Sequence, residues 1–284
     1  MTSNVQAPTG LARRGRRLSD RETERRMLQA ATAMVHRTGL TVSLDHISLE
    51  EVIREADVSR SAVYRRWPYK DLFFSDLVKE LARTATPTII DDELALINRI
   101  VAERLDWLDT PGRRHGLVIE LIRQLALLDF QTLHGSARWR TYLALHATFQ
   151  GLADGQLRDQ VQAALAQSEH THQAQVARAW ELLAGLFGYR LRPESGATFQ
   201  TLAALLDATM RGLVVMALSM PDLATHRTQA TPFGAATRDE WSLAALGVAS
   251  IASALLEPDP AIEWDDQRLA RLRQVLSSLT LPGR

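Results

Sequence analysis

The sequence contains no cysteine among its 284 residues, which excludes disulfides, thiol catalysis and thiolate metal sites. It also has no run of eighteen consecutive apolar residues, and the basic segment RRGRR near its start is followed by polar residues rather than by the apolar stretch of a signal peptide. The composition, 46% hydrophobic and 23% charged, is that of an ordinary globular protein. We therefore expect a cytoplasmic protein that neither spans a membrane nor is secreted.

Acidic and basic residues balance over the whole chain but not along it. Residues 1–70 hold 13 Lys and Arg against 8 Asp and Glu, a net charge of +5, whereas residues 71–284 hold 20 against 25, a net charge of −5. A basic head on an acidic body predicts that a polyanion binds the head alone.

The head begins with a basic arm and an amphipathic helix. Residues 1–18 combine Pro, Gly, Ser, Thr and Arg without an apolar period, which predicts a disordered arm. Ser19 and Glu22 form a capping-box pattern, and the helix that follows should end near Gly39. Its apolar or small residues lie at helical spacing, at Met27, Ala30, Ala31, Met34 and Val35.

Two short helices are predicted after the connector LTVSLDHI. Ser48 and Glu51 repeat the capping-box pattern at the start of LEEVIREA, which ends at Asp57. Ser59 suits the N-cap of a third helix, RSAVYRRW, which must end before Pro68 because the residue preceding a proline is pushed away from helical geometry. Two short helices joined by about three residues predict a helix-turn-helix.

The remainder of the chain predicts an all-α body. From residue 71 onward Ala and Leu dominate, and no convincing alternating strand appears. The segment 220–238 is long for a connection in a compact bundle, and we expect it to be mobile. The domains are thus the arm 1–18, the helix-turn-helix domain 19–70 and the body 71–284. The helices expected in the body are 71–83, 92–108, 113–132, 136–150, 156–188 (long enough to contain a break), 196–219, 239–256 and 265–279.

The third helix is expected to expose a basic face. At about 100° per residue, Val63 and Trp67 share one side with Val58 and should pack on the first two helices. The opposite side suits the major groove of DNA, because Arg bonds guanine edges, Ser bonds either edge and a small apolar residue contacts a thymine methyl. The residues on that side are Arg60, Ser61, Ala62, Tyr64 and Arg65.

Phosphate contacts are expected beside this face. Tyr64 and Lys70 lie at its flanks, and Lys70 begins the next helix, whose free backbone N–H groups attract phosphate. The arm is either a solubilising tail or an extension into the adjacent minor groove. A basic surface on an ordinary helical bundle is the alternative for the whole head. The candidate DNA contacts are Ser48, Ser59, Arg60, Ser61, Ala62, Tyr64, Arg65 and Lys70.

The residues of the head resemble a TetR-type transcriptional regulator. The first amphipathic helix, the segment SLEEVIREADVSRSAVYRRWPYKDLF and a long all-helical remainder follow the order of that family. The pattern matches at Val58-Ser59, at Val63-Tyr64, at the aromatic Trp67 and at Lys70-Asp71-Leu72, and it is specific over about residues 19–82. It departs from the family in a connector about four residues longer than usual, and in Tyr69, where a small N-capping residue is common.

The resemblance implies a homodimer that binds a palindromic operator as a repressor and leaves the DNA when a small molecule enters the helical C-terminal domain. An activator, or a DNA-binding protein that responds to no ligand, is the alternative on the same fold. A helical enzyme remains a further alternative, but no GxSxG motif or Gly-rich phosphate loop is present, and we expect neither catalysis nor a cofactor. His170 and His172 do not share a helix face, so no metal site is expected.

Candidate ligand contacts in the body are polar or aromatic residues within apolar runs. A ligand could supply a partner to such a group, although each could equally cap a helix, face solvent or pair within the protein. The candidate residues are Arg123, Trp139, His146, Trp180 and Arg211. The helices 196–219 and 239–256 are the candidates for dimerisation, because the segment LAALGVASIASALL is nearly all apolar or small; burial inside one protomer is the alternative.

Overall fold

The computed structural model is all-α, with a helix-turn-helix at the N-terminus and a larger helical unit after it, as the sequence predicts. It describes residues 18–39, 47–84 and 91–279, so nearly all of the predicted arm and of the first connector lie outside the described residues. The chain divides into one unit of residues 1–80 and a second of residues 81–284. The first unit therefore includes most of the helix α4 (Lys70–Thr84).

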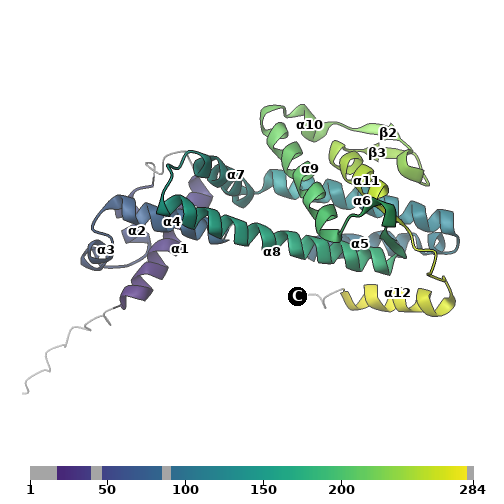
Figure 1. Ribbon diagram of the computed structural model, residues 1–284, viewed down its shortest axis with the longest axis horizontal. Helices are drawn as coiled ribbons and strands as arrows, with labels where there is room; N and C mark the ends of the chain where they lie inside the picture. The colour runs from purple at the N-terminus through teal and green to yellow at the C-terminus, as the bar shows by residue number, and fades with distance from the viewer. Residues whose placement is uncertain (1–17, 40–46, 85–90, 280–284) are drawn as a thin grey trace, which may run out of the picture. The chain divides into compact units, whose positions relative to one another are not determined.

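In the described part of the first unit three helices precede α4, and each begins directly after a predicted serine cap. They are α1 (Asp20–Thr38), α2 (Leu49–Glu55) and α3 (Arg60–Arg66), and Figure 1 shows them grouped at the purple end of the chain. The Oγ atoms of Ser19, Ser48 and Ser59 accept hydrogen bonds from the backbone N–H three residues further on, at 3.1, 3.4 and 3.3 Å. These bonds satisfy N–H groups that a helix leaves free at its start.

The core of the first unit fixes how α3 is turned. Val63 and Trp67 are fully buried, together with Met27 of α1 and Val52 of α2. The Trp67 ring meets Phe73 edge-on with 5.1 Å between the ring centroids, and its Nε1 donates a hydrogen bond of 2.9 Å to Asp76. The predicted buried side of α3 is thus confirmed, and its opposite side faces outward.

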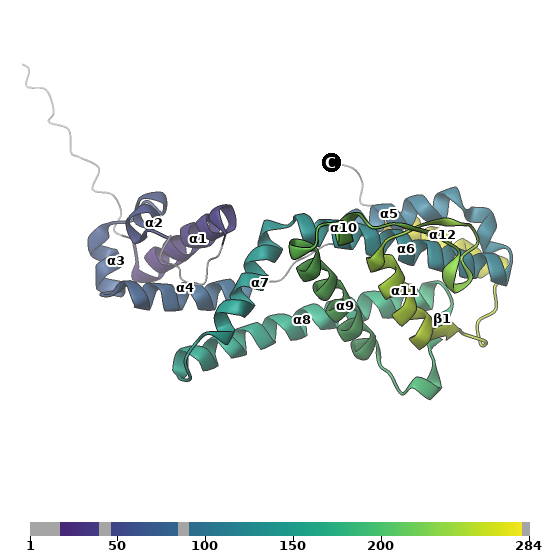
Figure 2. The ribbon, with the colours of Figure 1, turned by 90° about the horizontal axis from the view of Figure 1, so that it is seen from above.

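The second unit contains the helices that the sequence predicts, with somewhat different ends. The predicted helix 92–108 is in fact two elements, and the helix predicted over 156–188 runs without a break to Leu186. In Figure 2 the long helix α8 passes beside α9. The elements are α5 (Asp91–Glu103), the 3-10 helix η2 (Leu105–Leu108), α6 (Pro111–Gly135), α7 (Ala137–Gln150), α8 (Gln156–Leu186), α9 (Phe199–Ser219), α11 (Leu243–Leu255) and α12 (Asp266–Leu279).

The described residues also contain two pairs of three-residue antiparallel strands, which no alternating sequence pattern indicated. β1 (Tyr189–Leu191) pairs with β4 (Leu256–Pro258), and β2 (Thr228–Ala230) pairs with β3 (Asp239–Trp241). Three residues are too few to display an alternating pattern. The helix predicted over 239–256 consequently begins later than expected, at Leu243, where Ser242 caps it.

The long segment 220–238 contains defined structure rather than an open connection. It includes the short helix α10 (Asp222–Thr225), β2 and the 3-10 helix η4 (Pro232–Gly234). His115 of α6 holds it in place, because its Nε2 lies 2.7 Å from the Phe233 carbonyl oxygen and its Nδ1 lies 2.6 Å from the Tyr189 hydroxyl. Between them the two contacts tie three separate parts of the unit together.

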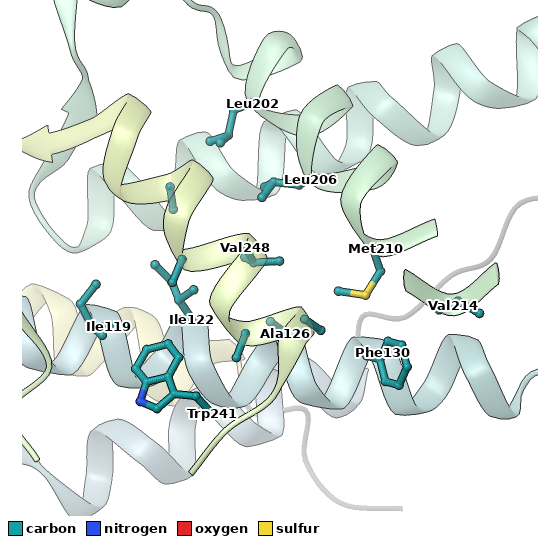
Figure 3. Packing of buried hydrophobic residues seen from close by; sticks show 14 of the residues in the cluster. Ile119, Ile122, Ala126, Phe130, Leu202, Leu206, Met210, Val214, Trp241 and Val248 are labelled. Carbon is teal, nitrogen blue, oxygen red and sulfur yellow. The ribbon is translucent and has the colours of Figure 1, made fainter. Parts of the chain in front are cut away.

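The core of the second unit lies between α6, α9 and α11. Figure 3 shows Ile122, Ala126 and Phe130 of α6 with Leu206 and Met210 of α9 in one apolar cluster. α9 is long and apolar enough to cross a membrane by length and composition, yet one side of it packs in this cluster. α11 also lies in the cluster, with most of its small residues buried.

Candidate functional site

The exposed side of α3 carries the predicted DNA contacts. Arg60, Ser61, Tyr64 and Arg65 are exposed, and Ala62 among them is half-buried. Ser59 is exposed just before the helix, and Ser48, the cap of α2, is half-buried. Because the buried Val63 and Trp67 fix the rotation of α3, these side chains project from the unit as one surface.

Acidic side chains of the neighbouring helices hold this surface in place. Glu50 of α2 receives a hydrogen bond of 3.0 Å from the Tyr64 hydroxyl and forms an ion pair of 2.7 Å with Arg60. Arg65 pairs with Asp20 of α1. Bonding to Glu50 raises the pKa of Tyr64. Exposed pairs of this kind contribute about 0–1 kcal/mol each, so a phosphate or base can replace them at small cost.

Lys70 lies at the start of α4, as the sequence predicts. Its side chain is exposed, and its Nζ lies 4.9 Å from the centre of the Phe74 ring. The ammonium group therefore stands beside the first turn of a fifteen-residue helix, where backbone N–H groups and the helix dipole also favour an anion. This is the arrangement expected of a phosphate contact.

A second candidate site is a cavity of about 260 Å³ inside the second unit. An engineered apolar cavity of about 150 Å³ is large enough to bind benzene, so this one has room for a larger ligand. Side chains of α5, α6, α8, α9 and α11 form its walls, and the apolar residues Ile122, Ala126, Leu206, Met210 and Val248 that line it also belong to the core cluster of Figure 3.

The structure brings three of the five predicted ligand contacts to this cavity and leaves two outside its lining. Trp139, Trp180 and Arg211 line it. Arg123 instead donates to Glu120 at 2.7 Å and to the Glu240 carbonyl oxygen at 2.9 Å. His146 packs edge-on against Tyr142 and lies 3.6 Å from Glu169, and burial lowers its pKa.

Arg211 is already paired with other side chains. Arg211 donates to the Tyr142 hydroxyl at 2.5 Å and forms ion pairs with Glu169 at 2.9 Å and Asp207 at 3.6 Å. His172 Nε2 also lies 3.3 Å from Asp207. Because the guanidinium group already has these partners, a ligand would gain little charge interaction with Arg211.

The lining also includes two carboxyl groups, Glu93 of α5 and Asp129 of α6, which no sequence pattern predicts. Burial, and then the charge of Asp129 and a hydrogen bond to it, raise the pKa of Glu93 to about 9. Burial raises the pKa of Asp129 as well. The two residues lie 36 positions apart on different helices, so only the tertiary structure reveals the pair.

Within the described residues, the second unit offers no constellation that suggests a metal site. No group of three or more His, Cys, Asp or Glu side chains there could hold an ion. His170 is exposed on α8, whereas His172, two residues further on, is half-buried with its Nε2 near Asp207.

The chain is similar to named regulators over part of its length. Over 84 residues, 28% of this chain, it is 38% identical to HTH-type transcriptional regulators of Mycobacterium bovis and Mycobacterium tuberculosis whose functions are uncharacterised. The match covers 42% of the length of each relative. No family model matches the chain.

Two solved structures are also similar to it. A TetR-family regulator from Mesorhizobium loti is 17% identical and has a TM-score of 0.45, over 84% of this chain and 98% of the other. SmeT, in complex with triclosan, is 20% identical to this chain with a TM-score of 0.42. The match covers 86% of this chain and 98% of SmeT. The chain is thus similar in sequence to HTH-type transcriptional regulators, and with its helix-turn-helix head and helical body it resembles the TetR-type regulators.

Proposed function

We propose that this protein is a ligand-responsive transcriptional regulator that binds a palindromic DNA operator as a homodimer. In this proposal it acts as a cytoplasmic repressor, and a small molecule that enters the cavity of the second unit releases it from DNA. The observation that carries the proposal is the exposed side of α3, where Arg60, Ser61, Tyr64 and Arg65 project from a helix held by buried Val63 and Trp67.

The chemistry of this surface supports sequence recognition rather than charge attraction alone. Arg60 can donate two hydrogen bonds to a guanine edge, and Ser61 can bond to either edge in the major groove. Lys70 lies outside this row and is suited to a phosphate, which fixes the register of the protein without reading sequence. Glu50 contacts both the Arg60 and the Tyr64 side chains in the absence of DNA.

An exposed apolar surface on α9 supports a dimer. Leu205, Val215, Met216, Leu218 and Met220 each expose between 45 and 54% of their surface, although they are large and apolar. Large apolar side chains left exposed along one helix and at its C-cap are candidates for a protein interface. A two-fold dimer would place the two α3 helices about 34–36 Å apart, one turn of DNA. The other candidate, α11, exposes only Ser250 and Ala254, and five of its residues are buried within the protomer.

The cavity supports control by a small molecule. It is lined mainly by apolar side chains with a few polar groups, which is the usual character of a ligand pocket. We propose that a ligand in the cavity favours a body conformation that shifts α4, so that the recognition helices of the dimer lose the spacing that the operator requires.

The test is binding of the purified protein to a duplex from upstream of its own gene and to a scrambled duplex, by fluorescence anisotropy across a salt series. We expect a preference of at least about a thousandfold for the native duplex. Arg60→Ala should reduce that preference by roughly 1–3 kcal/mol, whereas the matched control Arg178→Ala, which removes an exposed arginine of α8, should leave it unchanged. Equal, steeply salt-dependent binding of both duplexes by the wild-type protein would contradict specific recognition at this site.

A further inference from the structure

The carboxyl pair Glu93 and Asp129 is the part of the cavity that lacks a compensating charge. In the described part of the chain neither carboxyl forms an ion pair with a lysine, arginine or histidine. Asp129 Oδ1 is buried and has no hydrogen-bond partner. A proton retained on Glu93 allows that carboxyl to donate to the Asp129 carboxylate, which lowers the cost of burying two acidic groups together.

We propose that the cavity selects an amphipathic organic cation, with its ammonium or amidinium group at Glu93 and Asp129 and its apolar body against the walls formed by α6, α8 and α9. This inference rests on the proposed function, because it names the chemical class of the small molecule that the regulator detects. In the free protein one proton joins the two carboxyls; in the complex that proton leaves to solvent and the ligand's positive charge takes its place.

Charge over the whole lining favours a cation. With Glu93 protonated, the carboxylates of Asp129 and Asp207 face a single guanidinium, that of Arg211, while His172 contacts Asp207. Release of the Glu93 proton adds one more negative charge. The remaining titratable group of the lining is the Tyr189 hydroxyl, whose pKa burial raises to about 12, so it stays neutral. An anionic ligand would meet an excess of negative charge in a poorly hydrated space.

The aromatic walls strengthen the same preference. Trp139 and Trp180 line the cavity, and indole is the ring that attracts cations most strongly. Arg211 cannot serve as the internal cation for the carboxyl pair, because Glu169 and Asp207 already bind it. A ligand that brings its own cation therefore satisfies a buried charge that the protein leaves unpaired.

The test compares three bicyclic probes of equal size by isothermal titration calorimetry with the full-length protein at pH 7.5. The probes are 2-naphthylmethylamine, which is a cation, 2-naphthalenemethanol, which is neutral, and 2-naphthoate, which is an anion. We expect the amine to bind at least about tenfold more tightly than the alcohol, and the acid to bind weakest. Titrations in two buffers of different ionisation enthalpy should show that amine binding releases protons.

Two variants locate the effect. Glu93→Gln and Asp129→Asn should each remove the preference for the amine over the alcohol, and Glu93→Gln should also abolish proton release. The matched control is Glu103→Gln, which neutralises an exposed glutamate of the same helix. This variant should keep the preference for the amine over the alcohol and should still release protons when the amine binds. Melting temperatures of the variants show that the cavity unit remains folded.

The outcomes separate this inference from the function on which it rests. Equal affinities for amine and alcohol, tighter binding of the acid, or no binding of the amine up to 1 mM would overturn the inference. None of these results bears on operator binding, which is measured without a ligand. Conversely, failure of the protein to distinguish native from scrambled DNA, with the amine preference intact, would overturn the proposed regulator and leave the cation site.

Discussion

Neutralising Glu93 should change how the stability of the protein depends on pH. The pKa of Glu93 is raised from 4.5 to about 9 by burial and by Asp129. Between these values the folded protein holds a proton that the unfolded chain has lost. A raised pKa contributes stability at low pH that disappears as pH rises toward the folded value, at about 1.4 kcal/mol per pH unit.

The size of the effect follows from that slope. From pH 6 to pH 8 the wild-type protein should lose up to about 3 kcal/mol of unfolding free energy through this group, less whatever solvent access to the cavity relieves. Glu93→Gln cannot ionise, and its amide can still donate to Asp129. The variant should therefore gain stability relative to the wild type by about 2–3 kcal/mol over this interval, spread evenly across it, because the slope is constant well between the two pKa values.

The assay is urea denaturation at several pH values, followed by tryptophan fluorescence. Five of the six tryptophans lie in residues 81–284, so the signal reports mainly on the second unit. Titrating groups away from the Glu93–Asp129 pair are common to both proteins and cancel in the difference. Glu103→Gln provides the baseline: the difference in unfolding free energy between this variant and the wild type should not change with pH. If the difference between Glu93→Gln and wild type is the same at pH 6 and pH 8, Glu93 does not hold a buried proton and the reasoning fails.

Three further predictions concern other parts of the molecule. Glu50→Gln should raise affinity for all DNA sequences several-fold, because it frees Arg60 and Tyr64 and removes a charge that repels phosphate; anisotropy that shows unchanged or weaker binding would contradict this. Trp67→Phe should lower the stability of the first unit by about 1.5–3 kcal/mol, since the Trp67–Asp76 hydrogen bond involves a charged group, and an unchanged denaturation midpoint would count against that role. Gly234→Ala should lower the unfolding free energy of the second unit by at least about 1 kcal/mol, because Gly234 has a φ of 75° and a Cβ there would lie 2.8 Å from the His115 ring. Equal melting temperatures of the variant and the wild type would show that the turn tolerates a side chain.

Local signals were sufficient for the first unit. Ser19, Ser48 and Ser59 each predicted a helix start, and each accepts the expected backbone bond. The spacing of Val63 and Trp67 determined which side of α3 is buried. Capping and helical periodicity act within a few residues, so a sequence window contains all the information that they need.

The body was predictable only in outline. Its helices follow from their apolar period, but the strands of three residues leave too short a pattern, and His115 reaches Phe233 across 118 positions. The same limit applies to the cavity. Trp139, Trp180 and Arg211 stood out because their own helices are apolar, whereas Glu93 and Asp129 look like ordinary surface acids until α5 packs on α6.

The central claim is that α3 reads a DNA sequence. Repeated selection from a random duplex library, with the purified wild-type protein and with Arg60→Ala in parallel, tests it even though the operator sequence is unknown. We expect the wild-type protein to enrich an inverted repeat whose half-sites lie about 10 base pairs apart, centre to centre. Arg60→Ala should enrich a motif in which at least one position of each half-site accepts other bases. Recovery of unenriched sequences by the wild-type protein, with retention that falls steeply as salt rises, would contradict the account and leave only an electrostatic attraction between the basic head and DNA.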